Sequence, residues 1–153
     1  MAAICLTVEG SVKDAFQAAQ DDRSIRSLSL SISIADEAIT LTSTIPCSSS
    51  VSADFEALSA TLEEAQPQFI AFCVDDDANN GAAATARQWV LVCYVPDLSK
   101  PREKMLYSSS REALKRELGI GFFVKGDFYC NEPKDLSWEA YQTVGRYDVL
   151  RDT

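Results

Sequence analysis

The segment from Lys100 to Gly119 is the part of the chain whose residue types are best suited to bind another molecule. It carries six of the 14 Lys and Arg residues in a protein whose net charge is −9. A proline near its start and a glycine at its end are typical helix boundaries, and good helix formers lie between them. We therefore predict a helix over residues 100–119 that presents positive charge to an acidic partner.

Residue spacing divides this predicted helix into two faces. The residues expected to face the core are Leu106, Ala113, Leu114 and Leu118. The residues expected on the basic, solvent-facing side are Lys104, Ser108, Arg111 and Lys115, bordered by Met105 and Ser109. Two interpretations of the basic face stay open. Three glutamates of the same segment can balance it as an ordinary solvated surface, or it docks an acidic partner with Met105 as an apolar anchor.

Catalytic chemistry has little support in the sequence. The chain contains no histidine, which removes the commonest general base and the commonest zinc ligand. No GxSxG motif or glycine-rich phosphate loop is present. Cys73 and Cys93 lie inside apolar runs, where burial raises the pKa of a thiol and makes it unreactive. We predict a binding protein without a cofactor, and a thiol-dependent enzyme is the disfavoured alternative.

Metal binding is also not predicted. The cysteines are odd in number, widely spaced and contain no CxxC pair, so we expect reduced and mostly buried thiols. They are Cys5, Cys47, Cys73, Cys93 and Cys130. The acidic segment from Asp75 to Gly81 resembles a calcium loop, but Ala78 and Arg87 stand where ligands are needed. A solvated hairpin tip is the simpler interpretation.

Size and composition favour one soluble domain. The 153 residues are 46% hydrophobic and 24% charged, which is ordinary for a globular protein. No apolar run approaches the ~18 residues that a membrane span needs, and the N-terminal residues lack the features of a signal peptide. We expect a cytoplasmic, monomeric protein. Its acidity argues against a nucleic-acid partner.

The order of predicted elements indicates an α/β fold. Two alternating segments read as a hairpin with half-buried strands, and two nearly unbroken apolar runs read as central strands. We predict a central mixed sheet of five to six strands flanked by helices on both faces. The predicted helices are a first one starting at Ser11, one at 53–65 capped by Ser52, the long one at 100–119, and a last one starting at Ser137. The predicted strands are 25–34, 39–45, 69–74, 89–95 and 121–124, with Phe128 and Tyr129 in the last strand or in a turn.

The long helix also carries a resemblance to a known family. Its residues REKMLYSSSREALKREL resemble the long actin-binding helix of the actin-depolymerising-factor homology (ADF-H) domain, which cofilins share. The predicted order of elements resembles that domain across essentially the whole chain. The run WVLVCYVPDLSKPREKMLYSSSREALKRELG, followed by FVKGDFYCNEPKDLSWEAY, resembles the N-terminal domain of the twinfilin branch. We expect one ADF-H domain at residues 1–148, with a short tail or linker start at 149–153.

The resemblance implies a function in actin filament turnover, in the actin cytoskeleton. Family members bind actin at the cleft between two subdomains of the monomer, so we expect monomer sequestration with a preference for ADP-actin. The helix residues implied as actin contacts are Arg102, Lys104, Met105, Ser108, Ser109, Arg111, Glu112 and Lys115. An N-terminal actin contact is implied at Ile4, Cys5 and Leu6.

The sequence differs from the cofilin pattern at positions that concern phosphorylation and filament binding. Ile4 stands near the position of the cofilins' phosphorylated serine, so we expect that switch to be absent. The segment from Asp75 to Asp77 is acidic where cofilins use basic residues to contact filaments, which disfavours filament binding. Only Arg87 and Arg146 remain as a weak filament site. The alternatives are a cofilin-like protein that binds and severs filaments, and a regulator that binds phosphoinositides on the same basic helix.

Overall fold

Six strands form one mixed sheet in the computed structural model, which describes residues 6–22, 24–48, 50–74, 88–123 and 127–142. The strands are β1 (Thr7–Val8), β2 (Ile25–Ser33), β3 (Ala38–Pro46), β4 (Gln68–Cys73), β5 (Trp89–Tyr94) and β6 (Asp127–Cys130). The α-helices are α1 (Gly10–Asp21), α2 (Val51–Ala57) and α4 (Pro101–Leu118), and residues 138–142 begin another. Short 3-10 turns are η1 (Leu58–Thr61), η2 (Ile120–Phe122) and η3 (Pro133–Asp135).

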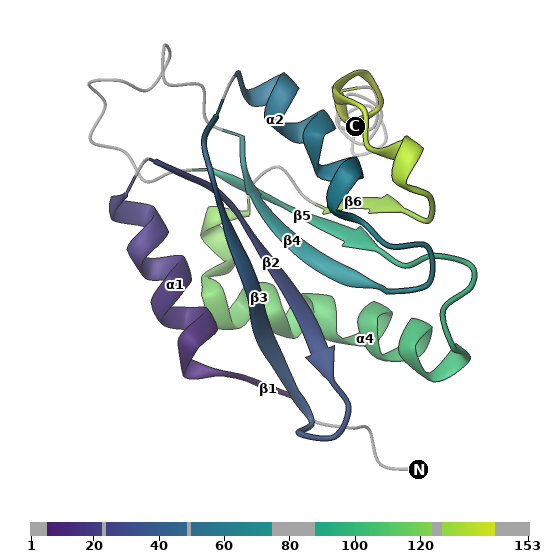
Figure 1. Ribbon diagram of the computed structural model, residues 1–153. Coiled ribbons are helices and arrows are strands. Elements are labelled where there is room, and N and C mark those ends of the chain that lie inside the picture. The colour runs from purple at the N-terminus through teal and green to yellow at the C-terminus, as the bar shows by residue number, and fades with distance from the viewer. Residues whose placement is uncertain (1–5, 23, 49, 75–87, 124–126, 143–153) are drawn as a thin grey trace, which may run out of the picture.

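The sheet has the order β1-β3-β2-β4-β5-β6. Its inner pairs, β3 with β2, β2 with β4 and β4 with β5, are antiparallel. Its two outer pairs, β1 with β3 and β5 with β6, are parallel. Helices α1 and α4 cover one face, and α2 with the C-terminal helical turn covers the other (Figure 1). This arrangement confirms the predicted α/β fold with helices on both faces of a mixed sheet.

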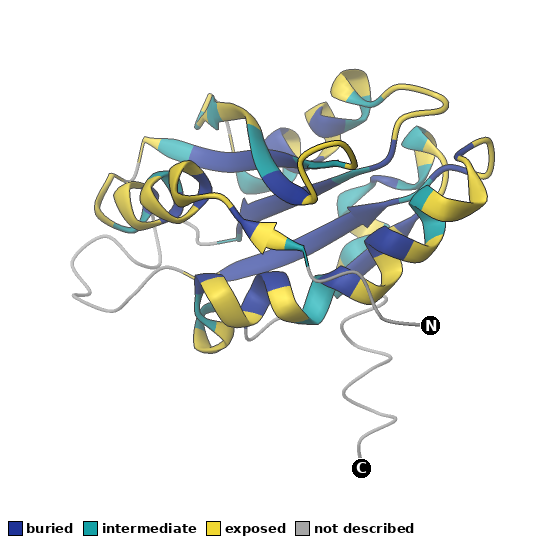
Figure 2. Ribbon diagram, turned by 90° about the horizontal axis from the view of Figure 1, so that it is seen from below, coloured by how far each residue is buried: buried dark blue, intermediate teal, exposed yellow. Residues whose placement is uncertain are grey.

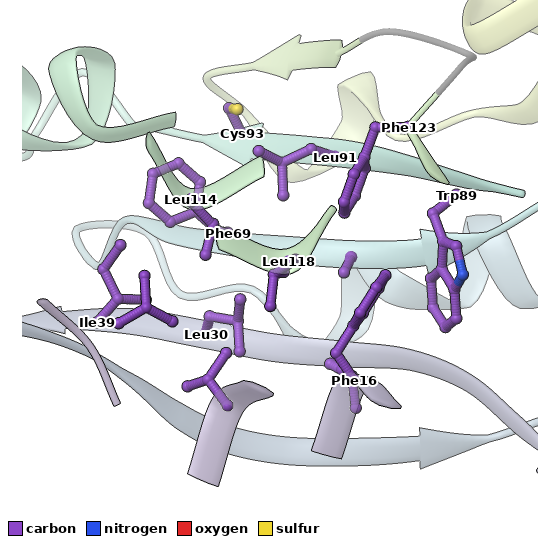
Figure 3. Close-up of a cluster of buried hydrophobic side chains, with 14 of the residues drawn as sticks. Phe16, Leu30, Ile39, Phe69, Trp89, Leu91, Cys93, Leu114, Leu118 and Phe123 are labelled. Atoms are coloured by element: carbon purple, nitrogen blue, oxygen red, sulfur yellow. The ribbon is translucent and has the colours of Figure 1, made fainter. Parts of the chain in front are cut away.

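The face under α1 and α4 holds the larger apolar core. Alternate residues of β4 and β5 point to it, and Figure 3 shows Phe69, Leu91 and Trp89 lying beneath the helices. Phe16 of α1 lies 4.9 Å from Trp89 and stacks on Phe123 at 5.6 Å between ring centroids. Burial of each such side chain contributes about 1.5–3 kcal/mol. This core is the base on which α4 rests.

The face under α2 is organised around Phe55. Its ring meets those of Phe72, Phe128, Trp138 and Tyr141 at centroid distances of 5.2 to 5.6 Å. The remaining residues of β4 and β5 point to this side, which explains why both strands are apolar throughout. Figure 2 shows the result as a layer of buried strands between helices whose outward surfaces are exposed.

The prediction that β2 is only half-buried is wrong. Its leucines face α1 as expected, but Ser27 and Ser29 on the other side are also buried. The cause is position, because β2 lies inside the sheet between β3 and β4, and α2 lies on the same side of the sheet as these serines (Figure 1). An irregularity of register between Ile25 and Ser27 places Arg26 on that face, where its Nε lies 3.0 Å from the Asp54 carboxylate of α2.

Helix boundaries were predicted with mixed success. The expected helix at 53–65 is divided into α2 and η1, and Ser50 rather than Ser52 caps it, accepting a bond from the Ala53 amide at 3.2 Å. Helix α1 begins at Gly10 after the N-cap Glu9, earlier than the predicted Ser11. Ser137 is confirmed as a cap, since its hydroxyl accepts a bond from the Ala140 amide at 3.1 Å.

The strand predicted at 121–124 is wrong. The chain forms the 3-10 turn η2 there, and the strand is β6, which contains Phe128 and Tyr129. The connector 75–86, with its failed calcium loop, lies outside the described residues. Among the described helices, none combines the length and apolar character needed to cross a bilayer.

The buried ion pair between Arg26 and Asp54 supports a first prediction. Both side chains are nearly inaccessible, at 3% and 6% exposure. Asp54→Asn should lower the free energy of unfolding by about 3–5 kcal/mol, because it removes the carboxylate that pairs with a buried guanidinium. Urea denaturation measures this, with Glu64→Gln at an exposed site as the matched control. An effect no larger than the control's would contradict the assignment.

Candidate protein-binding surface on helix α4

The ends of α4 are set by local sequence. Lys100 is the N-cap and Pro101 follows at the first helical position, while the Glu103 carboxylate accepts a bond from the Lys100 amide at 3.2 Å. At the other end Gly119 has a φ of +115°, and a Cβ there would lie 2.8 Å from the Phe122 ring. Only glycine fits that position. The predicted limits of the helix are thus confirmed, with physical causes at both ends.

The inward stripe of α4 differs from the prediction at one point. The buried residues are Leu106, Tyr107, Ser110, Leu114, Lys115 and Leu118. Ala113, expected in the core, is exposed. The buried side of the helix therefore includes Tyr107 in place of Ala113. The buried Ser110 hydroxyl donates a hydrogen bond to the Leu106 carbonyl.

Tyr107 fastens the first half of α4 to the sheet. Its ring packs on Phe69 at 4.9 Å, and its hydroxyl accepts a bond from the Ile32 amide at 2.8 Å. That amide needs a partner because β4 pairs with β2 only from Ser27 to Leu30. Burial raises the pKa of Tyr107 to about 12, so the hydroxyl stays protonated at neutral pH.

Asp127 of β6 fastens the second half. Its Oδ2 lies 2.9 Å from the Arg111 guanidinium, and its Oδ1 lies 2.8 Å from the Lys115 ammonium. Glu112 lies 2.8 Å from Arg111 and 3.3 Å from Lys115, and the bond from Lys115 lowers the pKa of its carboxyl group. The Tyr129 hydroxyl donates to Asp127 at 3.2 Å, and Arg111 lies over the Tyr129 ring at 5.6 Å.

The predicted basic face is therefore only partly available to a partner. Lys115 is buried, with 9% of its side chain exposed, so the expectation that it lies on the solvent-facing edge is wrong. Arg111 keeps 31% exposure and is paired on two sides. The sequence pattern missed this because Asp127 lies on a different element, 16 residues beyond Arg111.

The exposed part of the site is the first half of α4. Arg102, Ser108 and Ser109 are exposed, and Met105 has 53% of its surface accessible. Lys104 and Glu112 are partly exposed. Leu98, in the turn before the helix, is 70% exposed, and no periodicity could single it out. We call Arg102, Lys104, Met105, Ser108 and Ser109 the docking surface. It combines positive charge, hydroxyl groups and an apolar anchor.

The other predicted contacts lie elsewhere or cannot be placed. Leu6 is partly buried against the core beneath α1 and α4. Ile4, Cys5, Arg87 and Arg146 lie outside the described residues.

The thiols match their prediction within the described part of the chain. Cys73, Cys93 and Cys130 are buried, and Cys47 is partly exposed. Burial raises the pKa of Cys93, and it raises that of Cys130 to about 12. Unreactive thiols follow from those shifts. The described residues contain no group of three or more His, Cys, Asp or Glu side chains arranged to hold a metal ion.

Comparison with known proteins identifies the class to which this fold belongs. The family described as cofilin/tropomyosin-type actin-binding protein matches residues 5–144. Because the match covers most of the chain, the chain belongs to that family. Solved structures of lower identity share the fold, among them Plasmodium berghei actin depolymerization factor 2, with a TM-score of 0.74 and 16% identity over 95% of this chain and 99% of that one.

Within the family the chain is similar to twinfilins. It is 36% identical to a Dictyostelium discoideum twinfilin over 58% of this chain and 25% of the relative, and 30% identical to an Anopheles gambiae twinfilin over 74% and 32%. The solved structure of Eh twinfilin has a TM-score of 0.80 and 25% identity, covering 94% of this chain and 99% of that one. The chain thus spans only about a quarter to a third of the curated relatives it matches.

The bond between Tyr107 and Ile32 supports a second prediction. Tyr107→Phe should lower the free energy of unfolding by about 1–3 kcal/mol at neutral pH, because the Ile32 amide loses its acceptor while the ring still packs. The variant should also show a weaker loss of stability between pH 10 and 12. In the wild type the unfolded chain releases this proton near the ordinary value of 10.0, whereas the folded chain keeps it until about 12.

Urea titrations at pH 7 and at several values between 10 and 12 measure both effects. Glu64→Gln is the control, since Glu64 is exposed and the change removes neither a tyrosine hydroxyl nor a buried hydrogen bond. Equal stability of Tyr107→Phe and wild type at neutral pH would contradict the role given to this hydroxyl.

Proposed function

We propose that this chain is a binding module that sequesters actin monomers through the docking surface and so regulates filament turnover. The observation that carries the proposal is that Arg102 and Lys104 keep their charge available at the start of a firmly held helix. No ion pair within the described residues involves either of them. Membership of a family named for actin binding supplies the partner.

The chemistry of the docking surface supports a protein partner with acidic groups. The two cations Arg102 and Lys104, two residues apart at the start of α4, can meet carboxylates, and the exposed Met105 next to them can enter an apolar pocket. The helix is held by the core beneath it and by polar contacts at Tyr107 and Asp127. Little ordering is then needed on binding, which favours affinity.

The finer points of the proposal follow from the family resemblance. We propose that ADP-actin is preferred, that the folded unit covers residues 1–148, and that it acts as a monomer in the cytoplasm. Ile4, Cys5 and Leu6 are proposed as a second actin contact, with Arg87 and Arg146 as a weak filament contact. The remaining activities of full-length twinfilins stay outside this proposal because the chain spans only part of them.

A phosphoinositide headgroup is the second candidate ligand. The observation that favours it is the same two cations, Arg102 and Lys104, which form no ion pair within the described residues, since phosphates also bind clustered Lys and Arg side chains. Sedimentation with phosphoinositide vesicles tests this alternative, and sedimentation with actin filaments tests a cofilin-like activity. Vesicle binding without any actin binding would replace the proposal.

Charge reversal tests the proposal directly. The double variant Arg102→Glu/Lys104→Glu should weaken binding of actin monomers by about 30-fold or more, the effect of losing a central anchor. Fluorescence titration of labelled ADP-actin and ATP-actin measures this, and comparing the two nucleotide states tests the expected preference. Arg116→Glu is the matched control, because Arg116 is exposed on the same helix but near its other end. Unchanged affinity of the double variant would overturn the proposal.

Met105 supports a separate prediction about the apolar part of the contact. Met105→Ala should reduce affinity for actin monomers by about tenfold, because a buried apolar anchor is lost. Its effect should be nearly independent of salt, whereas that of charge reversal should shrink as salt rises. Folding should be unaffected, since the side chain is largely exposed in the free protein. An effect that varies with salt as strongly as charge reversal would contradict an apolar role.

A further inference from the structure

We propose that Asp127 limits the docking surface to the first half of α4 by neutralising Arg111 and Lys115. The inference rests on the proposed function, because it concerns which cations of α4 an acidic partner meets. It assigns Asp127 as a residue that sets specificity without touching the partner. It also reverses the expectation from the family resemblance that Arg111 and Lys115 are direct contacts.

The geometry of the carboxylate is the first argument. Each oxygen of Asp127 lies next to a different cation, Lys115 at 2.8 Å and Arg111 at 2.9 Å. The side chains of Asp127 and Lys115 are 6% and 9% exposed, so their attraction is weakly screened by water and salt. A partner that formed an ion pair with Lys115 would remove one of the two cations beside the buried Asp127 carboxylate. The loss of that ion pair would cost binding free energy.

The distribution of charge along the helix is the second argument. In the second half, Asp127 and Glu112 together balance Arg111 and Lys115, and the formal charges of Arg116 and Glu117 cancel, so these six side chains carry no net charge. In the first half Lys100, Arg102 and Lys104 stand against a single carboxylate, Glu103. An acidic partner is therefore attracted to one end of α4 and not along its whole length.

Removal of the Asp127 charge should have two effects of opposite sign. Asp127→Asn keeps the size of the side chain but leaves Lys115 with less compensation, so stability should fall. Arg111 is 31% exposed and can then turn toward solvent, which extends the basic surface. Affinity for actin monomers should rise by about threefold to tenfold at low salt, with a steeper dependence on salt. A purely structural role predicts that stability and affinity both fall.

The experiment compares five proteins by titration with labelled actin monomers at two salt concentrations. They are the wild type, Asp127→Asn, Asp127→Glu, Asp127→Asn/Arg111→Gln and Glu117→Gln. Glu117→Gln changes net charge by the same amount as Asp127→Asn, but it lies away from Arg111, where its carboxylate pairs with Lys13. Asp127→Asn should bind tighter than wild type and Glu117→Gln. Asp127→Glu should bind like the wild type, and the double variant should lose the gain.

Lysine labelling of the wild-type protein provides a test that needs no variant. With an amine-reactive ester and mass spectrometry, Lys115 should label slowly with and without actin, whereas Lys134, at 79% side-chain exposure, labels fast in both. Lys104 should become protected only when actin is present. Fast labelling of free Lys115 that actin then blocks would overturn the inference.

The outcomes separate this inference from the proposed function. If the wild type binds actin monomers and depends on Arg102 and Lys104, but Asp127→Asn binds no tighter than Glu117→Gln, only this inference fails. A gain that persists in Asp127→Asn/Arg111→Gln also overturns it. If the wild type binds no actin monomers, the proposed function fails and the inference falls with it.

Discussion

The site depends on how α4 is held against the sheet by two polar contacts of different kinds. Near its start, the Tyr107 hydroxyl accepts a bond from a strand amide that β4 leaves without a partner. One to two turns later, the Asp127 carboxylate holds two cations of the helix at 2.8 and 2.9 Å. Apolar burial alone would let the helix slide or rotate, because it is not directional. The polar contacts select one rotation, and that rotation decides which residues face solvent.

The same rotation of α4 decides which basic residues pair within the protein and which face solvent. A guanidinium or ammonium that pairs with Asp127 stabilises the position of the helix, and it has little charge left for a partner. Arg102 and Lys104 lie nearer the start of α4 than Glu112, which pairs with Arg111. Within the described residues their charges stay available to a partner. The chain thus combines a strongly acidic total charge with a short basic surface at the start of α4, and a surface of this kind can orient an acidic partner as well as attract it.

The sequence predicted well those features that depend on neighbouring residues in the chain. The limits of α4 follow from Pro101 and Gly119, and the central strands β4 and β5 were recognised from their continuous apolar residues. The predictions were wrong where the burial of a residue depends on an element that is distant in the sequence. Ser27 and Ser29 are buried in a strand that has β3 and β4 on either side, and Lys115 is buried where β6 brings Asp127 beside it. Residue spacing on one helix carries no information about charges supplied from another strand.

The family resemblance and the structure therefore answer different questions about α4. The resemblance over the run from Arg102 to Met105 implies contact positions, and that implication is useful only where those positions stay exposed. It does not transfer the neighbours of each position. Arg111 and Lys115 fit the motif, yet their surroundings in this chain include a carboxylate from β6 that accounts for their charge. Within the described residues, Arg102 and Lys104 are cations of the motif that form no ion pair, so they are the ones whose charge an acidic partner would meet.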